Sequence, residues 1–582
     1  MRVAVAGGTA AVAAAADEGG DSGGLWGSYW GIWLSGAIRT LISTPVLVRC
    51  LPSVPFFSMF ILSSPRSPKP TAKGSKAVES GPSKEAKEQE RVVVAGGGVS
   101  GLVLGACLQE IGLPFEILEK SSSGENSEGA DLALWPAATK ILKELGVGAT
   151  NASDASDFWG LKTYPARSMR ICKAETEKEQ PSLHGDKAPP AVPAPTANGG
   201  TDGGSANGVG SGLAVAAPET VLTKLDMDAV VRGEGEPFRL VGRQDVMSAL
   251  LPLVEKDNVR RGVSVVKAEQ SFVLGQTRAT AHITKNTESG GDLNCGGDEA
   301  SSVSCRVLVG ANGIHSVCRA AVSASVAMLP DAPSTPSPGT TVVNAMDAHD
   351  GGEVCYRGVL DLREGSPAAA AGLRAVFEEE EDRHPSSMRV VYGDRIRYSW
   401  GFIDGARETG YWFVKQLARG QGWPEPLRTF IDLTGEDCCY THQIQDRPPL
   451  ARWSCSNITL LGDACHPTTP NDGQGACTAI EDALVLATLL GEYWEKPDGH
   501  IEAFFLYERA RLAHTRRVQG EAFKHMKLGQ LTSRAGIWLR ELVTRSLPRS
   551  LLQKRMRAAN VYNIDPWLER FRALKAKRQQ RV

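Results

Sequence analysis

The 582-residue chain is 42% hydrophobic and 22% charged, which is typical of a globular protein with a large buried core and excludes a chain that is disordered throughout. Its formal net charge of -2 gives no electrostatic reason to expect nucleic acid as a partner. The cysteines include one close pair, Cys438 and Cys439, whose adjacency suits neither a metal clip nor a redox motif, so we predict no metal site.

Residues 1–88 are predicted to be a leader and a linker rather than a domain. Residues 22–78 contain no Asp or Glu but carry Lys and Arg among Ser, Thr and Pro, a composition typical of organelle transit peptides. The uncharged runs 25–38 and 50–65 are shorter than the roughly 18 residues that a membrane-spanning helix needs. We expect a plastid or mitochondrial location if the leader targets the chain and a cytoplasmic one otherwise. A membrane anchor is the less favoured reading.

The first chemical signal is a strand, glycine-rich turn, helix and strand between residues 91 and 120. The apolar run 92–95 is typical of a parallel strand buried on both faces, and a second run, 115–118, ends at Glu119. The glycines of a G-x-G-x-x-G pattern between them are Gly96, Gly98 and Gly101. Such glycines let the backbone approach a pyrophosphate, and an acid at this distance can accept a hydrogen bond from a ribose hydroxyl. The segment therefore predicts a dinucleotide site.

Residues 173–220 are predicted to form a flexible surface insertion. They are rich in Gly, Ala, Pro and Ser, and such a stretch buries too little apolar area to offset the entropy lost on ordering it. The nucleotide site needs residues from both sides, so the insertion should interrupt a domain rather than separate two. Beyond it, a further buried strand is predicted at 307–309, where Gly310 and Gly313 turn the chain tightly. In open parallel sheets, ligands bind at this end of the strands.

Residues 322–445 are predicted to supply the substrate pocket. The runs 388–403 and 410–416 are rich in aromatic and β-branched residues, which favours strands laid over the cofactor. Five aromatic residues of these runs could line the cavity, although aromatic strand residues more often belong to an ordinary core. They are Tyr392, Tyr398, Trp400, Trp412 and Phe413.

The most specific segment is 457–490. A predicted strand at 458–461 ends in Gly462 and Asp463, and an Asp in this place can hold a polyol hydroxyl. A glycine-rich turn then begins a helix, whose free N–H groups and positive dipole end suit the negative charge of a reduced flavin ring. The remaining candidate residues here are Pro470, Gly473, Gln474 and Gly475. His466 is read as a structural histidine rather than as an acid or base.

These three segments, in this order, resemble the single-component FAD monooxygenases of the para-hydroxybenzoate hydroxylase family, over roughly residues 91–519. The G-D-x6-P signature of the family is matched by Gly462, Asp463 and Pro470. The continuation PNDGQGACTAIEDA is similar to the urate hydroxylase-like and zeaxanthin epoxidase-like branches. The segment FRLVGRQDVMSALL resembles the Arg-containing helix of the family, which makes Arg243 a candidate FAD contact.

The resemblance implies FAD as the cofactor. The first glycine turn and Glu119 would hold its adenosine half, Asp463 its ribityl and pyrophosphate region, and residues 473–475 would lie against the isoalloxazine ring. It also implies NADPH or NADH as co-substrate, with a flavin C4a-hydroperoxide as the species that transfers oxygen from O2. Where the family has Asp-Gly, this chain has Asn312 and Gly313, which lowers the expected efficiency of pyridine-nucleotide use.

The substrate implied is a small organic molecule, aromatic or unsaturated, that is hydroxylated or epoxidised. Two alternatives stay open. One is a carotenoid or isoprenoid epoxidase of the same fold, and the other is an FAD-binding protein with weak or no monooxygenase activity.

The expected fold class is α/β, with a Rossmann-like FAD-binding domain, an inserted β-sheet substrate domain and C-terminal helices. The FAD-binding domain is expected in three parts, 89–172, 221–321 and 446–520. The substrate domain is expected at 322–445 and a helical region at 521–582. The basic C-terminal region should pack as ordinary helices, with contact to a membrane surface as the less favoured reading.

Overall fold

The computed structural model describes residues 90–122, 131–147, 161–174, 219–273, 276–285, 301–327, 348–363, 367–417 and 427–580. All of them lie in the compact unit Ser80–Val582. The predicted leader, 1–88, and the body of the predicted insertion, 175–218, lie outside the described residues. Within the part of the chain that is described, no helix is both long and apolar enough to cross a bilayer.

The nucleotide-binding half is built on a six-stranded sheet with the strand order β18-β19-β12-β1-β2-β8. Its strands are β1 (Val92–Ala95), β2 (Phe115–Glu119), β8 (Val259–Arg261), β12 (Val307–Gly310), β18 (Ser454–Cys455) and β19 (Ile458–Leu460). All neighbours pair in parallel except β18, which is antiparallel to β19. Every residue of β1 and β12 is buried, as expected for parallel strands covered on both faces. The first strands of the three nucleotide segments are thus neighbours in one sheet.

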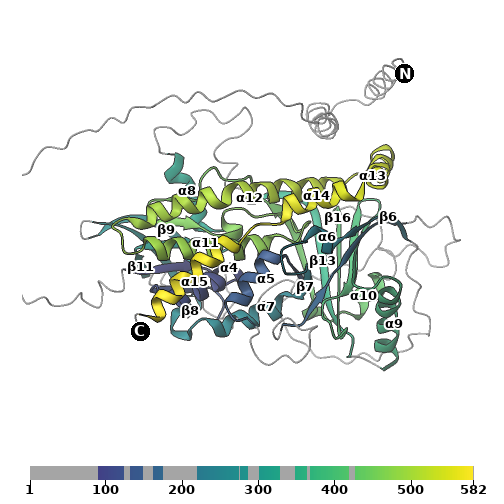
Figure 1. Cartoon of the computed structure of the whole chain (residues 1–582), viewed down its shortest axis with the longest axis horizontal. Coiled ribbons are helices and arrows are strands. Elements are labelled where there is room, and N and C mark those ends of the chain that lie inside the picture. The colour runs from purple at the N-terminus through teal and green to yellow at the C-terminus, as the bar shows by residue number, and fades with distance from the viewer. Residues whose placement is uncertain are drawn as a thin grey trace, which may run out of the picture. The chain divides into compact units, whose positions relative to one another are not determined.

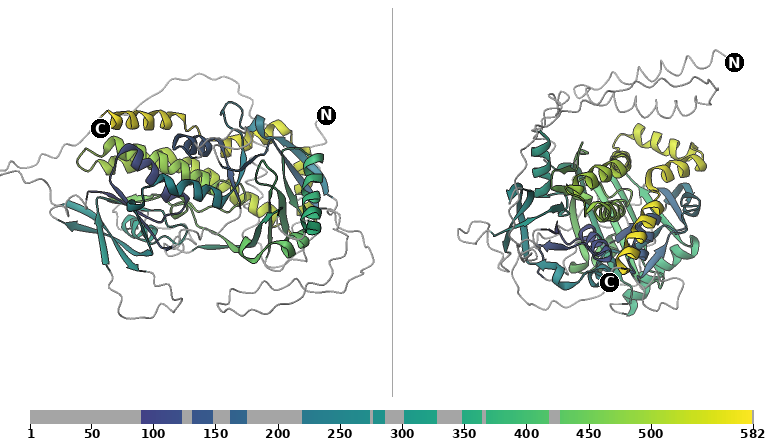
Figure 2. Two further views of the ribbon diagram at one scale, coloured as in Figure 1. Left: turned by 90° about the horizontal axis from the view of Figure 1, so that it is seen from below. Right: turned by 60° about the vertical axis from the view of Figure 1, so that its left-hand side comes forward.

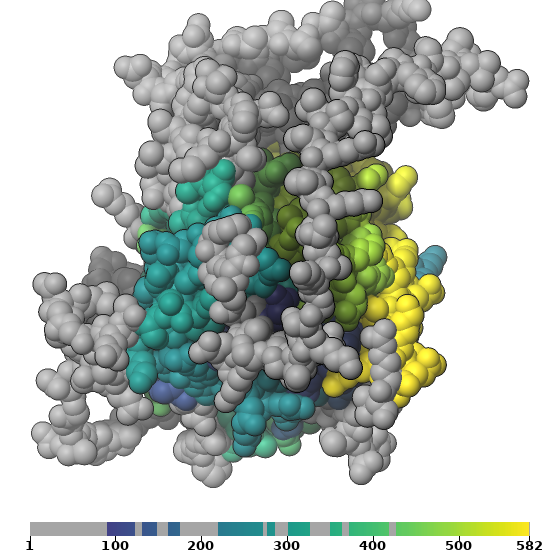
Figure 3. Space-filling view, turned by 90° about the vertical axis from the view of Figure 1, so that its left-hand side faces the viewer, coloured from purple at the N-terminus to yellow at the C-terminus, as the bar shows by residue number. Residues whose placement is uncertain are grey.

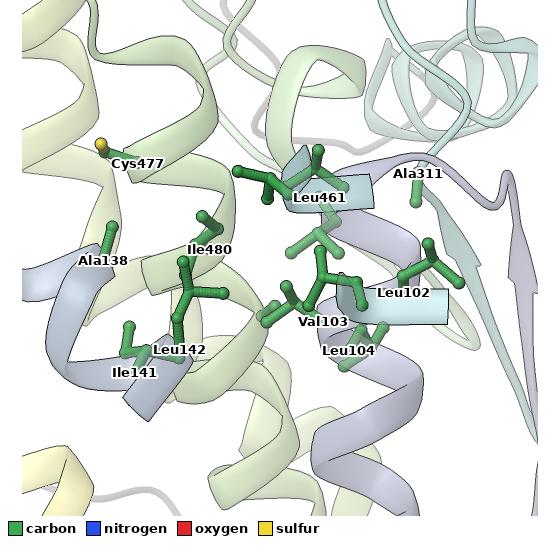
Figure 4. Close-up of a cluster of buried hydrophobic side chains, with 14 of the residues drawn as sticks. Leu102, Val103, Leu104, Ala138, Ile141, Leu142, Ala311, Leu461, Cys477 and Ile480 are labelled. Atoms are coloured by element: carbon green, nitrogen blue, oxygen red, sulfur yellow. The ribbon is translucent and has the colours of Figure 1, made fainter. Parts of the chain in front are cut away.

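Helices cover this sheet and form the largest part of the core. They are α4 (Val99–Ile111), α5 (Pro136–Glu144), α7 (Arg243–Leu250), α8 (Val317–Ala327), α11 (Gly475–Tyr493), α12 (Gly499–Gly529) and α15 (Asp565–Gln579). Figure 4 shows Leu102 and Val103 of α4 gathered with Leu461 and with Ile480 of α11, and all four are almost fully buried. A Cβ at Gly105 would lie 2.7 Å from the Ile117 side chain, so this glycine allows α4 to pack directly on β2. The core therefore fixes α4 and α11 against the sheet that carries the glycine turns.

The other half is a seven-stranded sheet with the order β17-β13-β16-β15-β14-β5-β6. Its strands are β5 (Ser168–Ala174), β6 (Glu219–Asp226), β13 (His349–Asp361), β14 (Ser387–Tyr392), β15 (Ile396–Phe402), β16 (Thr409–Leu417) and β17 (Cys439–Asp446). The pairs are antiparallel except β14 with β5. Helices α9 (Pro367–Arg383) and α10 (Leu427–Leu433) lie at the outer side of this sheet in Figure 1. An α/β fold with a β-sheet domain and C-terminal helices is confirmed.

The sheet topology differs from the expected domain boundaries in three places. Strands β5 and β6 flank the predicted insertion and were expected at the ends of FAD-binding parts 1 and 2, yet they pair with each other and with β14 in the second sheet. Helix α8 continues past the expected boundary at 321, and α12 runs unbroken through the one at 520. Sequence patterns mark the elements, but the assignment of β5 and β6 depends on pairing with strands more than 150 residues away in the chain.

Two small antiparallel sheets complete the α/β body. One has the order β11-β10-β9 and the other β3-β7-β4. Their strands are β3 (Asp131–Leu134), β4 (Thr163–Pro165), β7 (Arg239–Gly242), β9 (Val263–Val273), β10 (Gln276–Lys285) and β11 (Ser301–Cys305). Figure 2 shows the same body from two further sides, and in Figure 3 teal, green and yellow segments of the described chain adjoin one another on one face. The short α6 (Met227–Val230) and helices α13 (Arg534–Ser546) and α14 (Arg549–Asn560) lie toward the seven-stranded sheet in Figure 1.

Candidate cofactor and substrate site

The turn after β1 has the geometry that its glycines predict. Gly96 adopts a φ of 112°, and a Cβ there would lie 2.6 Å from the Ala311 carbonyl oxygen. A Cβ at Gly101 would lie 1.9 Å from the Gly96 carbonyl oxygen, which leaves no room for a side chain. At Gly98, by contrast, no atom lies within 4 Å of such a Cβ, so this turn of backbone faces open space. The first turn is closed toward the protein and open on one side.

Glu119 ends β2 beside this turn. Its Oε2 accepts a hydrogen bond from the Gly97 N–H at 2.6 Å, and its Oε1 accepts one from the Ser121 N–H at 2.8 Å. The carboxylate is half-buried and keeps further lone pairs for a ligand, because each oxygen can accept more than one bond. The acid is therefore locked in place at the edge of the open side of the turn.

The turn after β12 contacts the first turn directly. A Cβ at Gly96 would lie 2.9 Å from the Asn312 Cα as well, and a Cβ at Gly310 would meet Cys318 at 2.5 Å. Gly313 has a φ of 78°. The Asn312 Oδ1 atom is buried without a hydrogen-bond partner in the described part of the chain. The structure thus brings the first two nucleotide segments together and leaves one acceptor of Asn312 for a ligand or solvent.

The turn after β19 completes the group. Gly462 has a φ of 60°, and a Cβ there would meet Ala479 at 3.0 Å and Ser100 at 3.4 Å, so this turn also touches α4. The Asp463 side chain is solvent-exposed, although protein surrounds it on most sides. This desolvation raises the pKa of Asp463, while the charges of His466 and Arg243 act to lower it. An exposed carboxylate this deep in the protein marks a cleft, and the influence of Arg243 places that guanidinium near the same cleft.

These features fit FAD. Bare glycine backbone, a fixed carboxylate, an arginine and the N-terminus of α11 converge at the carboxyl ends of β1, β12 and β19, where open α/β sheets bind nucleotides. The roles of the individual residues stay predictions.

The loop 470–475 is held from the second sheet by cations that sequence reasoning missed. Lys415 Nζ donates to the Pro470 carbonyl at 2.5 Å, and Arg397 Nη1 donates to the Asn471 Oδ1 at 2.7 Å. His525 Nδ1 and the Asp472 Oδ1 are 2.5 Å apart. The signal in the sequence is that residues 397 and 415 fall on one face of their strands, but only the register of β15 with β16 makes them neighbours.

Gly473 and Gln474 have structural as well as predicted cofactor roles. A Cβ at Gly473, where φ is 63°, would lie 2.6 Å from the Ala133 Cβ on β3. The Gln474 side chain turns away into the protein and donates to the Asn560 carbonyl at 2.9 Å. If Gln474 contacts a flavin, it therefore does so through its backbone.

Lys415 gives a prediction about pH. Burial lowers the pKa of Lys415 to about 7, and the neighbouring Arg397 lowers it further, while Glu353 acts in the opposite sense. Between this value and the ordinary pKa near 10.5, the unfolded chain binds a proton that the folded chain does not, so the folded state gains stability as pH rises through this window. We expect Lys415→Met to flatten the rise in unfolding free energy from pH 7 to 10, measured by urea denaturation. The exposed Lys224→Met on β6 is the control, and parallel profiles for Lys415→Met and the parent would contradict the prediction.

A fully buried ion network lies beneath the Gly462 turn. Arg511 of α12 donates from Nε to the Asp482 Oδ1 and from Nη2 to the Glu481 Oε2, both at 2.6 Å. His466 Nε2 is 2.5 Å from the Asp482 Oδ2. The neighbouring Asp482 holds the pKa of His466 above its ordinary value despite burial, and burial raises the pKa of Glu481 to about 7. His466 is thus engaged in fixing the turn to α11 and α12, as its structural reading predicts.

Cys465, His466 and Asp482 place potential metal-ligand atoms within 4.8 Å of one another. Both oxygens of Asp482 are already bonded, to His466 and to Arg511, and the Cys465 thiol donates to the Gly462 carbonyl at 3.2 Å. These protein partners account for the cluster without an ion.

The two faces of the seven-stranded sheet separate the five candidate aromatic residues. Trp412 donates to the Thr434 hydroxyl at 2.9 Å, and Trp400 packs on Phe430 of α10, so both lie on the side of α9 and α10. Tyr398 stacks on Trp400 on that same side. These three residues are ordinary core, which corrects the expectation that they could line the substrate cavity. The reason is the period of two along a strand, which a shift of one residue inverts.

The opposite face looks toward the nucleotide-binding half, because Lys415 reaches the 470–475 loop from it. Phe413 lies two residues before Lys415 and pairs with Arg357 of β13, so both share this face. Tyr392 pairs with Arg397 on it, but lies near Arg397 and Arg540 toward the end of α12. Of the five aromatic candidates, Phe413 is therefore the one best placed for the pocket.

Arg357 is the polar group at the centre of this face. Its Nη1 is 3.9 Å from the Asp131 Oδ1 on β3, too far for a hydrogen bond. The Arg357 Nε and the Asp131 Oδ1 are both buried without hydrogen-bond partners in the described residues. Since β3 also contacts Gly473, this pair lies between the second sheet and the turn predicted to meet the flavin.

A family model described as an FAD binding domain matches residues 89–332 and 446–521. The chain belongs to this family. The match spans the six-stranded sheet with all three glycine turns, and it leaves the middle strands of the second sheet outside.

Characterised relatives of this FAD-binding protein are monooxygenases. It is 25% identical to the aurachin C monooxygenase/isomerase of Stigmatella aurantiaca, over 80% of this chain and 96% of that protein. It is 25% identical to a 3-hydroxybenzoate 6-hydroxylase of Klebsiella oxytoca, over 57% of this chain and 72% of that protein. It is 23% identical to a chloroplastic zeaxanthin epoxidase of Oryza sativa subsp. japonica, of which it spans 54%. The predicted class, an FAD-dependent monooxygenase, is confirmed.

Solved structures agree on the fold. The structure of Klebsiella pneumoniae HpxO complexed with FAD and uric acid matches with a TM-score of 0.54 and 19% identity, over 81% of this chain and 96% of that one. A salicylate hydroxylase substrate complex matches with a TM-score of 0.54 and 16% identity, over 83% of this chain and 98% of that one.

Proposed function

We propose that this monooxygenase uses NADPH or NADH and O2 to hydroxylate a small, planar, unsaturated molecule that carries an acidic or strongly polar group. The observation that carries the proposal is the cationic face of the second sheet opposite the Gly473 turn. Arg357, Arg397 and Lys415 lie on it, and two of them already bind the 470–475 loop. Arg357 is left to meet a substrate.

The residues proposed to hold FAD follow the geometry of the three turns. The glycines at 96, 98 and 101 with Glu119 would bind the adenosine half, and Asp463 with Arg243 the pyrophosphate and ribityl region. The turn 473–475 would approach the ring, and the nearby Gly310 and Asn312 would flank the cleft. When bound, FAD supplies the electron transfer and oxygen activation that amino acid side chains cannot.

The chain's own contribution is position, charge and exclusion of water. The N-terminus of α11 and the cations on β15 and β16 favour negative charge that develops beside the 470–475 loop. Phe413 offers an apolar surface to a planar ring, while Arg357 can pair with its acidic group. Burial between two sheets keeps competing water away from the reacting atoms.

The test is a screen with the purified flavoprotein. We expect acidic aromatic compounds, such as hydroxybenzoates and hydroxyquinolines, to stimulate NADPH or NADH oxidation and to gain one oxygen atom by mass spectrometry. Turnover of carotenoids with no response to acidic aromatics would overturn the proposal in favour of the isoprenoid epoxidase. That second candidate is favoured by the zeaxanthin epoxidase relatives but not by the charged face.

Arg357 gives a sharper prediction for the same site. If it pairs with the substrate, Arg357→Met should raise KM by about tenfold or more, since a charge-assisted hydrogen bond contributes roughly 1.5–3 kcal/mol. FAD content should stay unchanged, and Arg357→Lys should retain part of the affinity because the charge remains. Arg363→Met, at the exposed end of β13, is the matched control. A lower kcat with unchanged KM for Arg357→Met would show that this guanidinium does not bind the substrate.

A further inference from the structure

Helix α13 is attached to the protein by one narrow face. Arg540 is its one buried residue. The Arg540 guanidinium lies over the Tyr392 ring at 5.0 Å, and its Nη1 donates to the Leu528 carbonyl at 3.2 Å. The adjacent Glu541 pairs with Lys173 of β5 at 3.3 Å. Figure 1 shows α13 beside α14 at the edge of the body, next to the seven-stranded sheet.

The face opposite Arg540 is apolar at its centre. Trp538 and Leu542 come two residues before and after Arg540, which places them about 160° away around an α-helix. Their exposed fractions are 62% and 43%. An amphipathic helix normally buries such side chains against its own protein. Here the protein does not take them up.

The flanks of this apolar centre are basic. Arg534 and Arg545 lie in the same outer half of α13, and Arg549 at the start of α14 continues the line; all three are exposed. Lys554 and Arg555 add exposed cations on α14. Between residues 527 and 560 the sequence contains one acid, Glu541, and it is paired inward with Lys173. The outer face therefore combines large apolar side chains with uncompensated positive charge.

We propose that the outer face of α13 and the start of α14 dock on the surface of a membrane that contains anionic phospholipids. Trp538 and Leu542 would enter the boundary between headgroups and acyl chains, a depth that Trp favours. Arg534, Arg545 and Arg549 would contact the phosphates, since long basic side chains extend from apolar surface to polar headgroups. The charges select an anionic surface, and the flanked apolar centre suits a lipid interface better than an acidic protein. The proposal does not depend on which substrate the enzyme oxidises.

The experiment is co-sedimentation of the full chain with vesicles. One set contains phosphatidylcholine and phosphatidylserine in equal amounts, and the other contains phosphatidylcholine alone. We expect binding to the mixed vesicles that weakens steeply with added salt, because exposed charges are screened within a Debye length. Trp538→Ser with Leu542→Ser should weaken it at least tenfold, and Arg545→Glu with Arg549→Glu by more than that, because each basic residue near an anionic surface contributes about a fivefold factor.

The matched control is Ile501→Ser with Phe505→Ser on α12. These side chains are similarly exposed, at 51% and 58%, but the exposed Glu502 lies between them. This variant should bind like the parent, and all variants should keep their FAD and their NADPH or NADH oxidation. Unchanged binding of the Trp538 and Leu542 variant would overturn the proposal, as would equal binding to both vesicle types. A lack of binding to any vesicle would overturn it too and leave the face to an acidic protein.

Discussion

Replacement of Asp463 by Ala is expected to yield a folded protein that has lost most of its FAD. The carboxylate lies in the cleft where the three glycine turns meet, and its solvent-exposed position leaves it available to a ligand. A charge-assisted hydrogen bond contributes roughly 1.5–3 kcal/mol, so FAD affinity should fall about ten- to a hundredfold. Asp463→Asn should be intermediate, since it keeps an acceptor but not the charge.

The measurement is FAD content by absorbance, followed by titration of the stripped protein with FAD. Asp432→Ala on α10 is the matched control, because it removes an exposed acid from the far side of the second sheet. A stably folded Asp463→Ala protein with parent-like FAD affinity would remove Asp463 from the cofactor site, although the family assignment would stand.

The largest effect on stability is expected at Arg511. Its guanidinium neutralises two buried carboxylates at once, and neither Glu481 nor Asp482 is exposed to solvent. Removing one member of a buried ion network leaves uncompensated charge, at a cost of about 3–5 kcal/mol. We therefore expect Arg511→Met to lower the free energy of unfolding by this amount and to release FAD, because the network also anchors the Gly462 turn through His466.

The pH dependence separates this cause from lost packing. Without Arg511 the folded-state pKa values of both acids should rise above their unfolded values. The folded chain then binds more protons, so the variant loses stability as pH rises and its deficit shrinks in acid. Urea denaturation at pH 5 and pH 8 would measure this difference. Arg509→Met, exposed on the same helix, should change stability by no more than about 0.5 kcal/mol. A pH-independent loss in Arg511→Met would instead assign its effect to packing.

Local patterns were sufficient to predict the nucleotide-binding half. Strands β1, β12 and β19 are short apolar runs followed by glycine turns, and such signals depend on neighbours in sequence. The contacts of Arg397, Lys415 and His525 could not be predicted in this way. They depend on strand register and on the approach of α12, which are set by residues far apart in the chain. The misassigned Trp400 and Trp412 have the same cause, because the pattern of a doubly covered strand does not reveal which face meets the cofactor.

The hairpin of β5 and β6 has a consequence for how this chain tolerates change in length. Ala174 and Glu219 are cross-strand partners, so the two ends of the intervening segment are held one strand spacing apart. The entropy of closing a loop grows only with the logarithm of its length, so lengthening or shortening the segment between these ends costs little free energy. Residues can be added or lost at this point without disturbing the pairing of β5 with β14. The edge of the second sheet is thus a permissive site, at which the gene can acquire new sequence while the oxidative machinery stays intact.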